Sequence, residues 1–234
     1  MPTPAFIPPA AHDAPLPPAR AAAAGTRVLP GVPYAALPGI RPLELDVWLP
    51  PESRTPSPAV LFLHGGGWRA GSRHLAGPAF SGAQPTPFEQ LARAGIAVAS
   101  ADYRLSGEAR WPAQLHDVKA AVRWLRARAG ELGIDGERIA AWGESAGGHL
   151  AELLGLTMDD PALEGGDGRA RLRLQILKPR LAHQHFAHDQ DRPAVADQTG
   201  RMRDGAQRVV VITVSRDHLS PPLRLQIGLR CRRV

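Results

Sequence analysis

The residue with the clearest chemical potential is Ser145, which lies in the glycine-rich segment Gly143–Gly148. An apolar run, Ile139–Trp142, precedes this segment, and a helix-forming run, Leu150–Leu154, follows it. A strand that turns sharply through Gly-x-Ser-x-Gly into a helix is typical of an elbow that exposes a nucleophilic serine. Glycines on both sides of the serine let the strand and the helix approach closely. We therefore predict that Ser145 is a nucleophile, and the residues predicted to support it are Gly143, Glu144 and Gly147.

A second glycine-rich stretch, His64–Trp68, directly follows the apolar run Ala59–Leu63. It therefore lies at the carboxyl end of a predicted buried strand, where a loop that stabilises an oxyanion belongs. Successive glycines allow backbone N–H groups to turn toward one point, as a tetrahedral oxyanion requires. The helix after Ser145 adds its own first N–H group and the positive end of its dipole. The predicted oxyanion hole consists of the N–H groups of Gly66, Gly67 and Ala146.

Four stretches carry a wider resemblance, and they are His64–Trp68, Ala101–Leu105, Asp117–Leu125 and Gly143–Gly148. Together they resemble the α/β-hydrolase carboxylesterases, in particular the bacterial hormone-sensitive-lipase and feruloyl-esterase-like (BD-FAE-like) group. The resemblance extends from about Val28 to about Glu164. It implies an α/β-hydrolase fold and the hydrolysis of small acyl or aryl esters, with feruloyl esters and an arylformamidase-type amide activity as variants. It implies an acyl-enzyme on Ser145 and no metal or organic cofactor.

Two histidines lie close to these motifs, and either could supply the general base that a serine nucleophile needs. His64 belongs to the stretch that resembles the family's oxyanion loop, so we interpret it as a residue that orders this loop, together with Gly65 and Trp68. His149 lies four residues after Ser145 on the predicted helix. We interpret it as a packing or hydrogen-bonding residue.

The rest of a catalytic triad should follow the serine, with the acid before the histidine and each on a loop after a later strand. The run Val209–Val214 predicts such a strand, and Asp217 in the proline-containing loop after it is the candidate acid, with a plain turn aspartate as the alternative. His218 is the candidate base, although it adjoins the acid and no histidine follows it. Three earlier histidines could act out of order or form a weak metal site, but a polar segment is the better interpretation. They are His183, His185 and His188.

Composition divides the chain into three parts. Residues 1–38 contain ten prolines and little periodicity, which predicts an extended or poorly ordered segment. Residues 39–165 alternate predicted strands and helices, which indicates an α/β-hydrolase core with a mostly parallel central sheet and helices on both faces. Residues 166–234 contain thirteen Arg and one Lys against six Asp and no Glu, a net charge of +8 within a total of +6. This predicts an atypical or incomplete C-terminal part, through a change of reading frame or a replacement.

Within the predicted core, the apolar pattern places individual elements. Leu43–Leu49 alternates apolar and mostly polar residues with period two, as in a half-buried strand, and two more apolar runs predict buried strands. These runs are 59–63 and 96–99. Helical spacing of apolar residues, with proline in the first turn and glycine near the end, predicts helices over 87–94 and 112–130.

Overall composition narrows the classes of protein. A chain of 234 residues with 44% apolar content can bury one core, and its single cysteine excludes an internal disulfide. We expect a cytoplasmic protein with no membrane partner, because no run of about 18 apolar residues or secretory leader is present. The basic C-terminal part has a single aromatic residue, Phe186, which argues against nucleic-acid binding. The sequence sets no oligomeric state.

Two function classes remain open. The first is a serine carboxylesterase that acts on a small-molecule ester, and the two glycine-rich motifs favour it. The second is a non-catalytic hydrolase-like protein, truncated or frame-shifted, that lacks the catalytic histidine. The absence of a well-placed histidine after the candidate acid favours this alternative.

Overall fold

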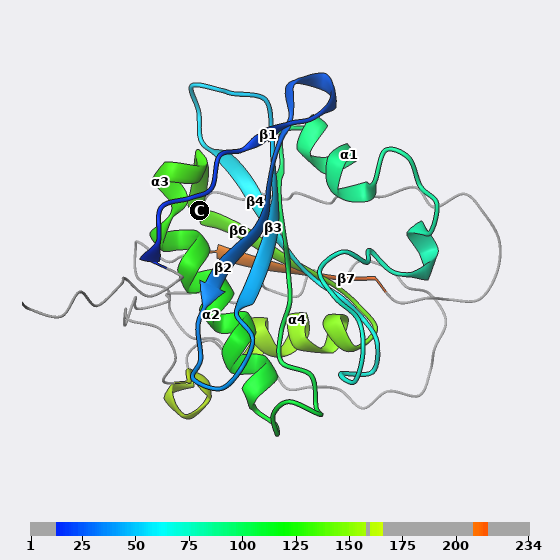
Figure 1. Ribbon diagram of the computed structural model, residues 1–234, viewed down its shortest axis with the longest axis vertical. Helices are drawn as coiled ribbons and strands as arrows, with labels where there is room; N and C mark the ends of the chain where they lie inside the picture. Colours follow the sequence, from blue (N-terminus) through cyan, green and yellow to red (C-terminus); the bar gives the residue numbers. More distant parts are fainter. Residues whose placement is uncertain (1–12, 158–159, 166–207, 215–234) are drawn as a thin grey trace, which may run out of the picture.

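A seven-stranded sheet forms the centre of the protein, with strand order β1-β2-β3-β5-β4-β6-β7 (Figure 1). The computed structural model describes residues 13–157, 160–165 and 208–214. The strands are β1 (Arg20–Ala21), β2 (Arg27–Ala35), β3 (Leu43–Leu49), β4 (Ser57–Leu63), β5 (Ala97–Ala101), β6 (Ile134–Glu144) and β7 (Arg208–Val214). The helices are α1 (Pro87–Arg93), α2 (Ala113–Ala127), α3 (Ala129–Leu132) and α4 (Ala146–Leu156), and short 3₁₀ turns occupy Ala23–Gly25, Pro78–Phe80 and Pro161–Leu163.

The sheet combines an antiparallel edge with a parallel centre. β1, β2, β3 and β5 pair antiparallel in that order, whereas β5, β4, β6 and β7 run parallel to one another. In the parallel part, Leu63 at the end of β4 pairs with both Ala101 and Gly143. The carboxyl ends of β5, β4 and β6 therefore meet at one edge of the sheet, which brings the loops that follow them together.

Alternating side chains give the sheet two apolar faces. In β4, Ala59, Leu61 and Leu63 point into one core cluster and Val60 and Phe62 into the other. Because a strand sends successive side chains to opposite faces, a continuously apolar run means that both faces are covered. Helices α2 and α4 contribute to the first cluster and α1 to the second, and α1 and α2 lie on opposite sides of the sheet (Figure 1). The predicted sheet with helices on both faces is confirmed.

The elements predicted from periodicity are also present, with small shifts at their ends. The helix predicted over 87–94 is α1, which begins with a capping box between Thr86 and Glu89. The helix predicted over 112–130 ends earlier, because α2 stops at Ala127 and α3 follows it. In β3 the alternation has the predicted sense, since Leu43, Leu45, Val47 and Leu49 all lie in the larger core cluster.

The N-terminal segment differs from its prediction, because β2 lies within residues 1–38. Nine residues, Arg27–Ala35, form an ordered strand on β3, with Leu29, Val32 and Tyr34 buried. Pro30 and Pro33 argued against a strand in the sequence, since a proline removes one hydrogen-bond donor from a sheet ladder. The pairing accommodates them with register irregularities between Leu29 and Val32 and between Pro33 and Ala35. The segment is therefore partly a strand of the core sheet, and the remaining domain divisions stay predictions.

A buried lysine fastens the chain after α4 to helix α2. The Lys119 side chain is fully buried, and its Nζ donates to the carbonyl of Thr157 at 2.6 Å and to Glu164 Oε1 at 2.7 Å. Arg123 reaches the other carboxylate oxygen of Glu164 at 3.3 Å. Burying an ammonium group is tolerated only when it is paired and hydrogen-bonded, as it is here. The contact holds the segment that follows α4 against α2.

Among the residues that the structure describes, no helix combines the length and the apolar character of a membrane-spanning segment.

The smaller core cluster yields a stability prediction. Phe62 is fully buried, with its ring 4.9 Å from that of Phe88 and 4.6 Å from that of Trp142. Phe62→Ala should lower the free energy of unfolding by about 3–5 kcal/mol, because it removes apolar contacts and leaves a cavity. Urea unfolding would measure this. Leu156→Ala, at a side chain that is 82% exposed, should stay within about 0.5 kcal/mol of the parent, and equal losses in the two variants would contradict the assignment.

Candidate active site

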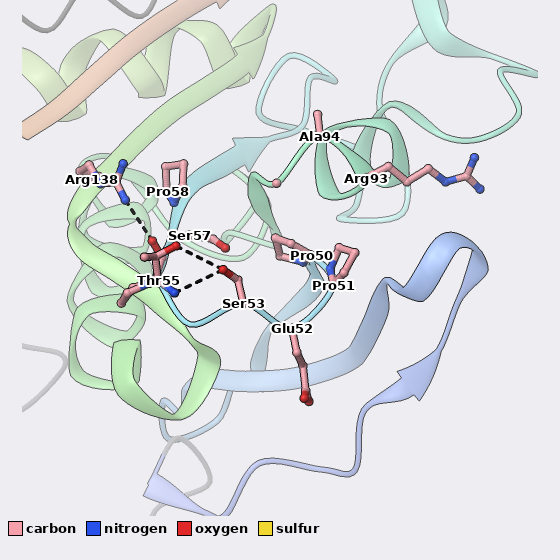
Figure 2. Close-up of a pocket in the computed structure, with 12 residues that line it drawn as sticks. Pro50, Pro51, Glu52, Ser53, Thr55, Ser57, Pro58, Arg93, Ala94 and Arg138 are labelled. Carbon is pink, nitrogen blue, oxygen red and sulfur yellow. Dashed lines mark hydrogen bonds between the residues drawn. The ribbon is translucent and has the colours of Figure 1, made fainter.

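The two ends of the parallel strands differ in what they offer to a ligand. At the amino ends of β4 and β6 lies an open hollow of about 560 Å³, lined by Pro50, Glu52, Ser57 and Arg138 among others (Figure 2). Ligands of open α/β sheets bind instead outside the carboxyl ends of the strands. Ser145 and the stretch His64–Trp68 both lie at that opposite edge. The candidate site is therefore built there.

Ser145 connects β6 to α4 in a backbone conformation that non-glycine residues rarely adopt. Its φ is 52° and its ψ is −113°, and Ser145 is exposed to solvent. The turn is so tight that no side chain fits at Gly143 or Gly147. A Cβ on Gly143 would overlap the carbonyl of Gly147, and a Cβ on Gly147 would overlap the carbonyl of Leu63. The serine is thus held on a strained turn that abuts the end of β4.

The glycine-rich loop after β4 bends through three successive residues with positive φ. These are Gly66 (113°), Gly67 (61°) and Trp68 (59°). The carbonyl of Gly66 accepts hydrogen bonds from the N–H groups of Arg69 and Ala70, both at 3.1 Å, which turns the loop back on itself. A Cβ on Gly65 would overlap the carboxylate of Glu144. The loop therefore packs directly against the residue that precedes Ser145.

His64 is buried beneath this loop. Its Nδ1 lies 2.7 Å from the carbonyl oxygen of Gly65, and its ring stacks on Tyr103 with centroids 4.3 Å apart. The Tyr103 hydroxyl donates to the His64 carbonyl at 2.8 Å. Burial lowers the pKa of His64 below its usual 6.5, against the opposing effects of the Gly65 hydrogen bond and the Asp102 charge. An imidazole that is buried, stacked on Tyr103 and held by the Gly65 carbonyl fits the predicted loop-ordering role better than that of a base.

The Asp102–Ser106 stretch supports the loop from behind, and the sequence analysis assigned no role to most of it. Besides the stacking of Tyr103, the N–H of Ser106 donates to the Trp68 carbonyl at 2.7 Å. The Tyr34 hydroxyl of β2 donates to the Asp102 carbonyl at 2.6 Å. In the sequence, the available signal was Tyr103 between two charged residues, in a stretch that resembles the family.

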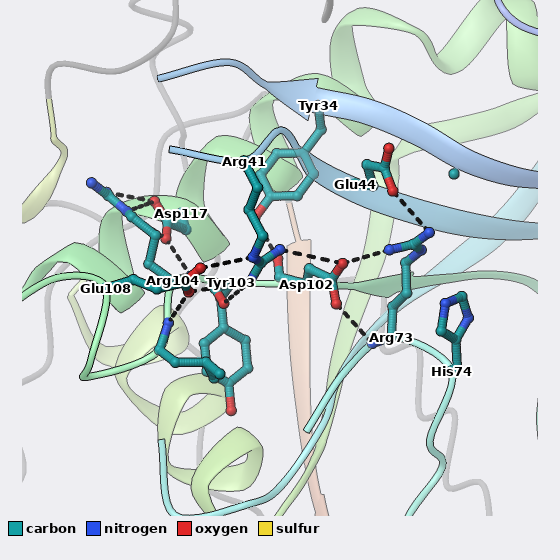
Figure 3. A network of polar contacts seen from close by, with 12 residues as sticks. Tyr34, Arg41, Glu44, Arg73, His74, Asp102, Tyr103, Arg104, Glu108 and Asp117 are labelled. Carbon is teal, nitrogen blue, oxygen red and sulfur yellow. Dashed lines mark hydrogen bonds and ion pairs between the residues drawn. The ribbon is translucent and has the colours of Figure 1, made fainter. Parts of the chain in front are cut away.

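Arg73, which was not among the predicted site residues, joins the loop to β3 and to Asp102, the residue directly after β5 (Figure 3). Its guanidinium bridges three carboxylates, with Nη2 to Glu44 at 2.8 Å, Nε to Asp46 at 2.9 Å and Nη1 to Asp102 at 2.6 Å. Burial lowers the pKa of Arg73, but its hydrogen bonds to Asp46 and Asp102 outweigh this effect and the pKa is raised. No sequence pattern marks this network, because its members come from three separate segments.

The neighbouring aromatic rings lie on the open side of the site. Trp68 meets the ring of His149 edge to face, with centroids 5.2 Å apart, and Trp111 lies 6.4 Å from the same imidazole. Trp68 and Trp111 are 37% and 53% exposed. His149 thus makes the ring contacts expected of a packing residue, while its backbone N–H donates to the Ser145 carbonyl at 3.1 Å.

The remaining predicted site residues lie outside the described residues. These are Asp217, His218, His183, His185 and His188. The strand predicted before the candidate acid is present as β7, and its last residue, Val214, pairs with Glu144 beside the serine. Within the described residues, no histidine hydrogen-bonds to the Ser145 side chain. The location of an acid and a base thus stays a prediction.

The strained serine gives a test of the turn. Ser145→Gly should raise the free energy of unfolding by about 1 kcal/mol relative to Ser145→Ala, because glycine adopts this backbone conformation without strain while its freer unfolded chain offsets part of the gain. Chemical denaturation of the two variants would measure the difference. If Ser145→Ala is as stable as Ser145→Gly, the backbone at this position is not strained.

The buried imidazole gives a test of pH dependence. The pKa of His64 is lower in the folded state than its usual value of 6.5, so below pH 6.5 the unfolded chain binds the proton more readily. The contribution of His64 to the free energy of unfolding is therefore fully present above pH 6.5 and is lost as the pH falls below it. The free energy of unfolding should therefore fall less between pH 7.5 and 5.5 in His64→Asn than in the parent. Urea titrations at several pH values would measure it, and parallel pH profiles would contradict the burial of a neutral His64.

Comparison with known proteins extends these observations. Esterase LipC of Mycobacterium tuberculosis is 42% identical over 118 residues, which are 50% of this chain and 28% of LipC. The probable carboxylic ester hydrolase LipM of the same organism is 37% identical over 150 residues, or 63% of this chain and 33% of LipM. A solved bacterial heroin esterase aligns with a TM-score of 0.49 and 32% identity over 59% of this chain and 41% of its own. The chain spans about a third of the length of the curated relatives it matches.

A family model also matches the chain. The BD-FAE family model matches residues 45–175, more than half of the chain. The matched range contains the glycine-rich loop, the Asp102–Ser106 stretch and the serine turn, and it covers most of the parallel sheet. The chain therefore belongs to the BD-FAE family of α/β-hydrolases.

Proposed function

We propose that the chain is a serine carboxylesterase that hydrolyses small acyl or aryl esters through an acyl-enzyme on Ser145. One observation carries the proposal: a strained, exposed serine turn packs against a glycine-rich loop at the carboxyl ends of β6 and β4. This is the arrangement that acyl transfer to serine needs. The names of the relatives LipC and LipM, an esterase and a probable carboxylic ester hydrolase, support it.

The mechanism has two steps. The Oγ of Ser145 attacks the ester carbonyl carbon, and the resulting tetrahedral intermediate expels the alcohol and leaves an acyl-serine. Water then attacks the acyl-serine, which releases the acid and restores the hydroxyl group. The N–H groups of Gly66, Gly67 and Ala146 hold the negative oxygen in both steps. Because Ala146 is the first residue of α4, its N–H has no partner within the helix.

Proton transfer in both steps requires a general base. His218, with Asp217 to orient it, remains our candidate, because both residues follow β7 and this strand ends beside the serine turn. His64 is a weaker candidate, since its Nδ1 faces the Gly65 carbonyl and its ring is stacked and buried.

A second function is favoured by a single observation. No histidine follows His218 in the sequence, where the fold normally places the catalytic base, and this favours a hydrolase-like protein that binds ligands without turnover. The oxyanion hole and binding alone would leave a residual acceleration of about 10³-fold over water. The two functions therefore differ by a measurable rate.

Ester hydrolysis by purified protein separates the two functions. The parent should hydrolyse p-nitrophenyl acetate and butyrate at least about 10³-fold faster than Ser145→Ala, because this substitution removes the nucleophile. A fluorophosphonate probe should label the parent and not Ser145→Ala.

The matched control is Ser53→Ala, at an exposed serine in the hollow at the other end of the sheet, which should keep the parent's rate and labelling. Equal rates in the folded parent and Ser145→Ala, without labelling, would establish the non-catalytic protein instead.

A further inference from the structure

The glycine-rich loop is held at its entrance and at its exit by different contacts. At the entrance, His64 is fixed by the stacking and the hydrogen bond of Tyr103. At the exit, the chain passes Gly71, where a Cβ would overlap the imidazole of His64, and reaches Arg73. Between these two points lie the N–H groups proposed to bind the oxyanion. Their direction depends on how firmly both ends are held.

Arg73 is gripped by its backbone as well as by its side chain. Its N–H donates to Asp102 Oδ1 at 2.9 Å, and its carbonyl accepts from the Ser100 hydroxyl at 2.6 Å. The guanidinium bridges the carboxylates of Glu44, Asp46 and Asp102 (Figure 3). These partners belong to β3, to β5 or, for Asp102, to the position directly after β5, so the exit of the loop is fixed to the sheet.

The geometry of this grip is specific to arginine. Three different nitrogens of one planar group face three carboxylates at 2.6–2.9 Å. Lysine offers a single ammonium at the end of a flexible chain and cannot bridge the same three positions. The Arg73 side chain is only 15% exposed, so these contacts are partly shielded from water and from screening by salt.

The two grips share one dipeptide. Asp102 holds Arg73 at the exit, and Tyr103, the next residue, holds His64 at the entrance. Because Asp102 and Tyr103 are adjacent, we expect a displacement at Arg73 to reach the residue that supports the other end of the loop. The Arg73 side chain links the loop both to Glu44 in β3 and to Asp102, directly after β5.

We propose that Arg73 is a positioning residue, which fixes the exit of the glycine-rich loop so that the N–H groups of Gly66 and Gly67 stay aimed at the developing oxyanion. The inference rests on the proposed esterase function. Arg73 acts through the loop and does not touch the substrate. Its removal should therefore weaken stabilisation of the transition state while leaving binding of the ester nearly unchanged.

The surrounding charges decide which variants can test this proposal. Besides the three carboxylates, Arg41 lies 3.5 Å from Asp102, and His74 lies 3.0 Å from Asp46. Removing the Arg73 charge would leave the carboxylates facing one another, and such a variant could fail to fold. Arg73→Lys keeps the charge and loses the bridging geometry. Ser100→Ala keeps the whole ion-pair network and loses only the hydrogen bond to the Arg73 carbonyl.

Steady-state kinetics on p-nitrophenyl acetate is the first measurement. Arg73→Lys should lower kcat about 10-fold to 100-fold, because loss of one oxyanion donor costs about 10²–10³ in kcat and misplacement costs less than loss. Ser100→Ala should lower kcat by a smaller factor, and KM should stay within about twofold in both. Lys119→Met, which breaks a buried ion pair away from the loop, should reduce stability and keep the parent's kcat.

Amide hydrogen exchange tests the same proposal without any catalysis. Peptides that cover residues 65–71 should exchange faster in Arg73→Lys than in the parent. Their exchange rate in Lys119→Met should equal that of the parent. If the parent hydrolyses no ester but this exchange still accelerates, Arg73 does fix the loop and the esterase function is wrong. An unchanged kcat, or a raised KM at constant kcat, in a hydrolysing parent would overturn the proposal, as would unchanged exchange in Arg73→Lys.

Discussion

The contact on which the site depends is a backbone-to-backbone approach between the first turn of α4 and the last residue of β4. Gly147 lies so close to the Leu63 carbonyl that no side chain fits between them, and Gly143 faces Gly147 in the same way. This approach sets the distance between the serine turn and the glycine-rich loop. It also forces Ser145 into its positive φ. The rest of the sheet, with helices on both faces, holds two parallel strands at the register that makes the approach possible.

Local pattern was sufficient to predict the elements that carry the motifs. Alternation in β3, the continuous apolar run of β4 and the helical spacing of α2 each reflect burial that the chain's own periodicity records. β2 was not predicted, because its two prolines are typical of a disordered segment. Its pairing with β3 shows that the irregular register accommodates them. Periodicity describes which face is buried. It does not describe how a ladder accommodates a missing donor.

The support of the site was beyond local pattern for a different reason. Arg73 binds carboxylates that lie 27 to 29 residues away in either direction, and Tyr103 holds a residue 39 positions before it. Charged and aromatic residues occur throughout the chain, so their types alone do not indicate which of them meet. The two glycine-rich motifs were recognisable because every residue in them serves a single turn. The supporting contacts are dispersed, and only the folded sheet assembles them.

The position of β7 has a consequence for the order in which the sheet can assemble. Every neighbouring pair from β2 to β6 joins segments that stand within the first 144 residues, whereas β7 pairs with β6 across the interval from Glu144 to Arg208. Closing so long an interval is entropically costly and slow compared with pairing between near neighbours. During synthesis from the N-terminus, the serine turn and the glycine-rich loop are complete before β7 exists. Among the described strands, the one that borders the nucleophile is therefore synthesised last, after both glycine-rich motifs.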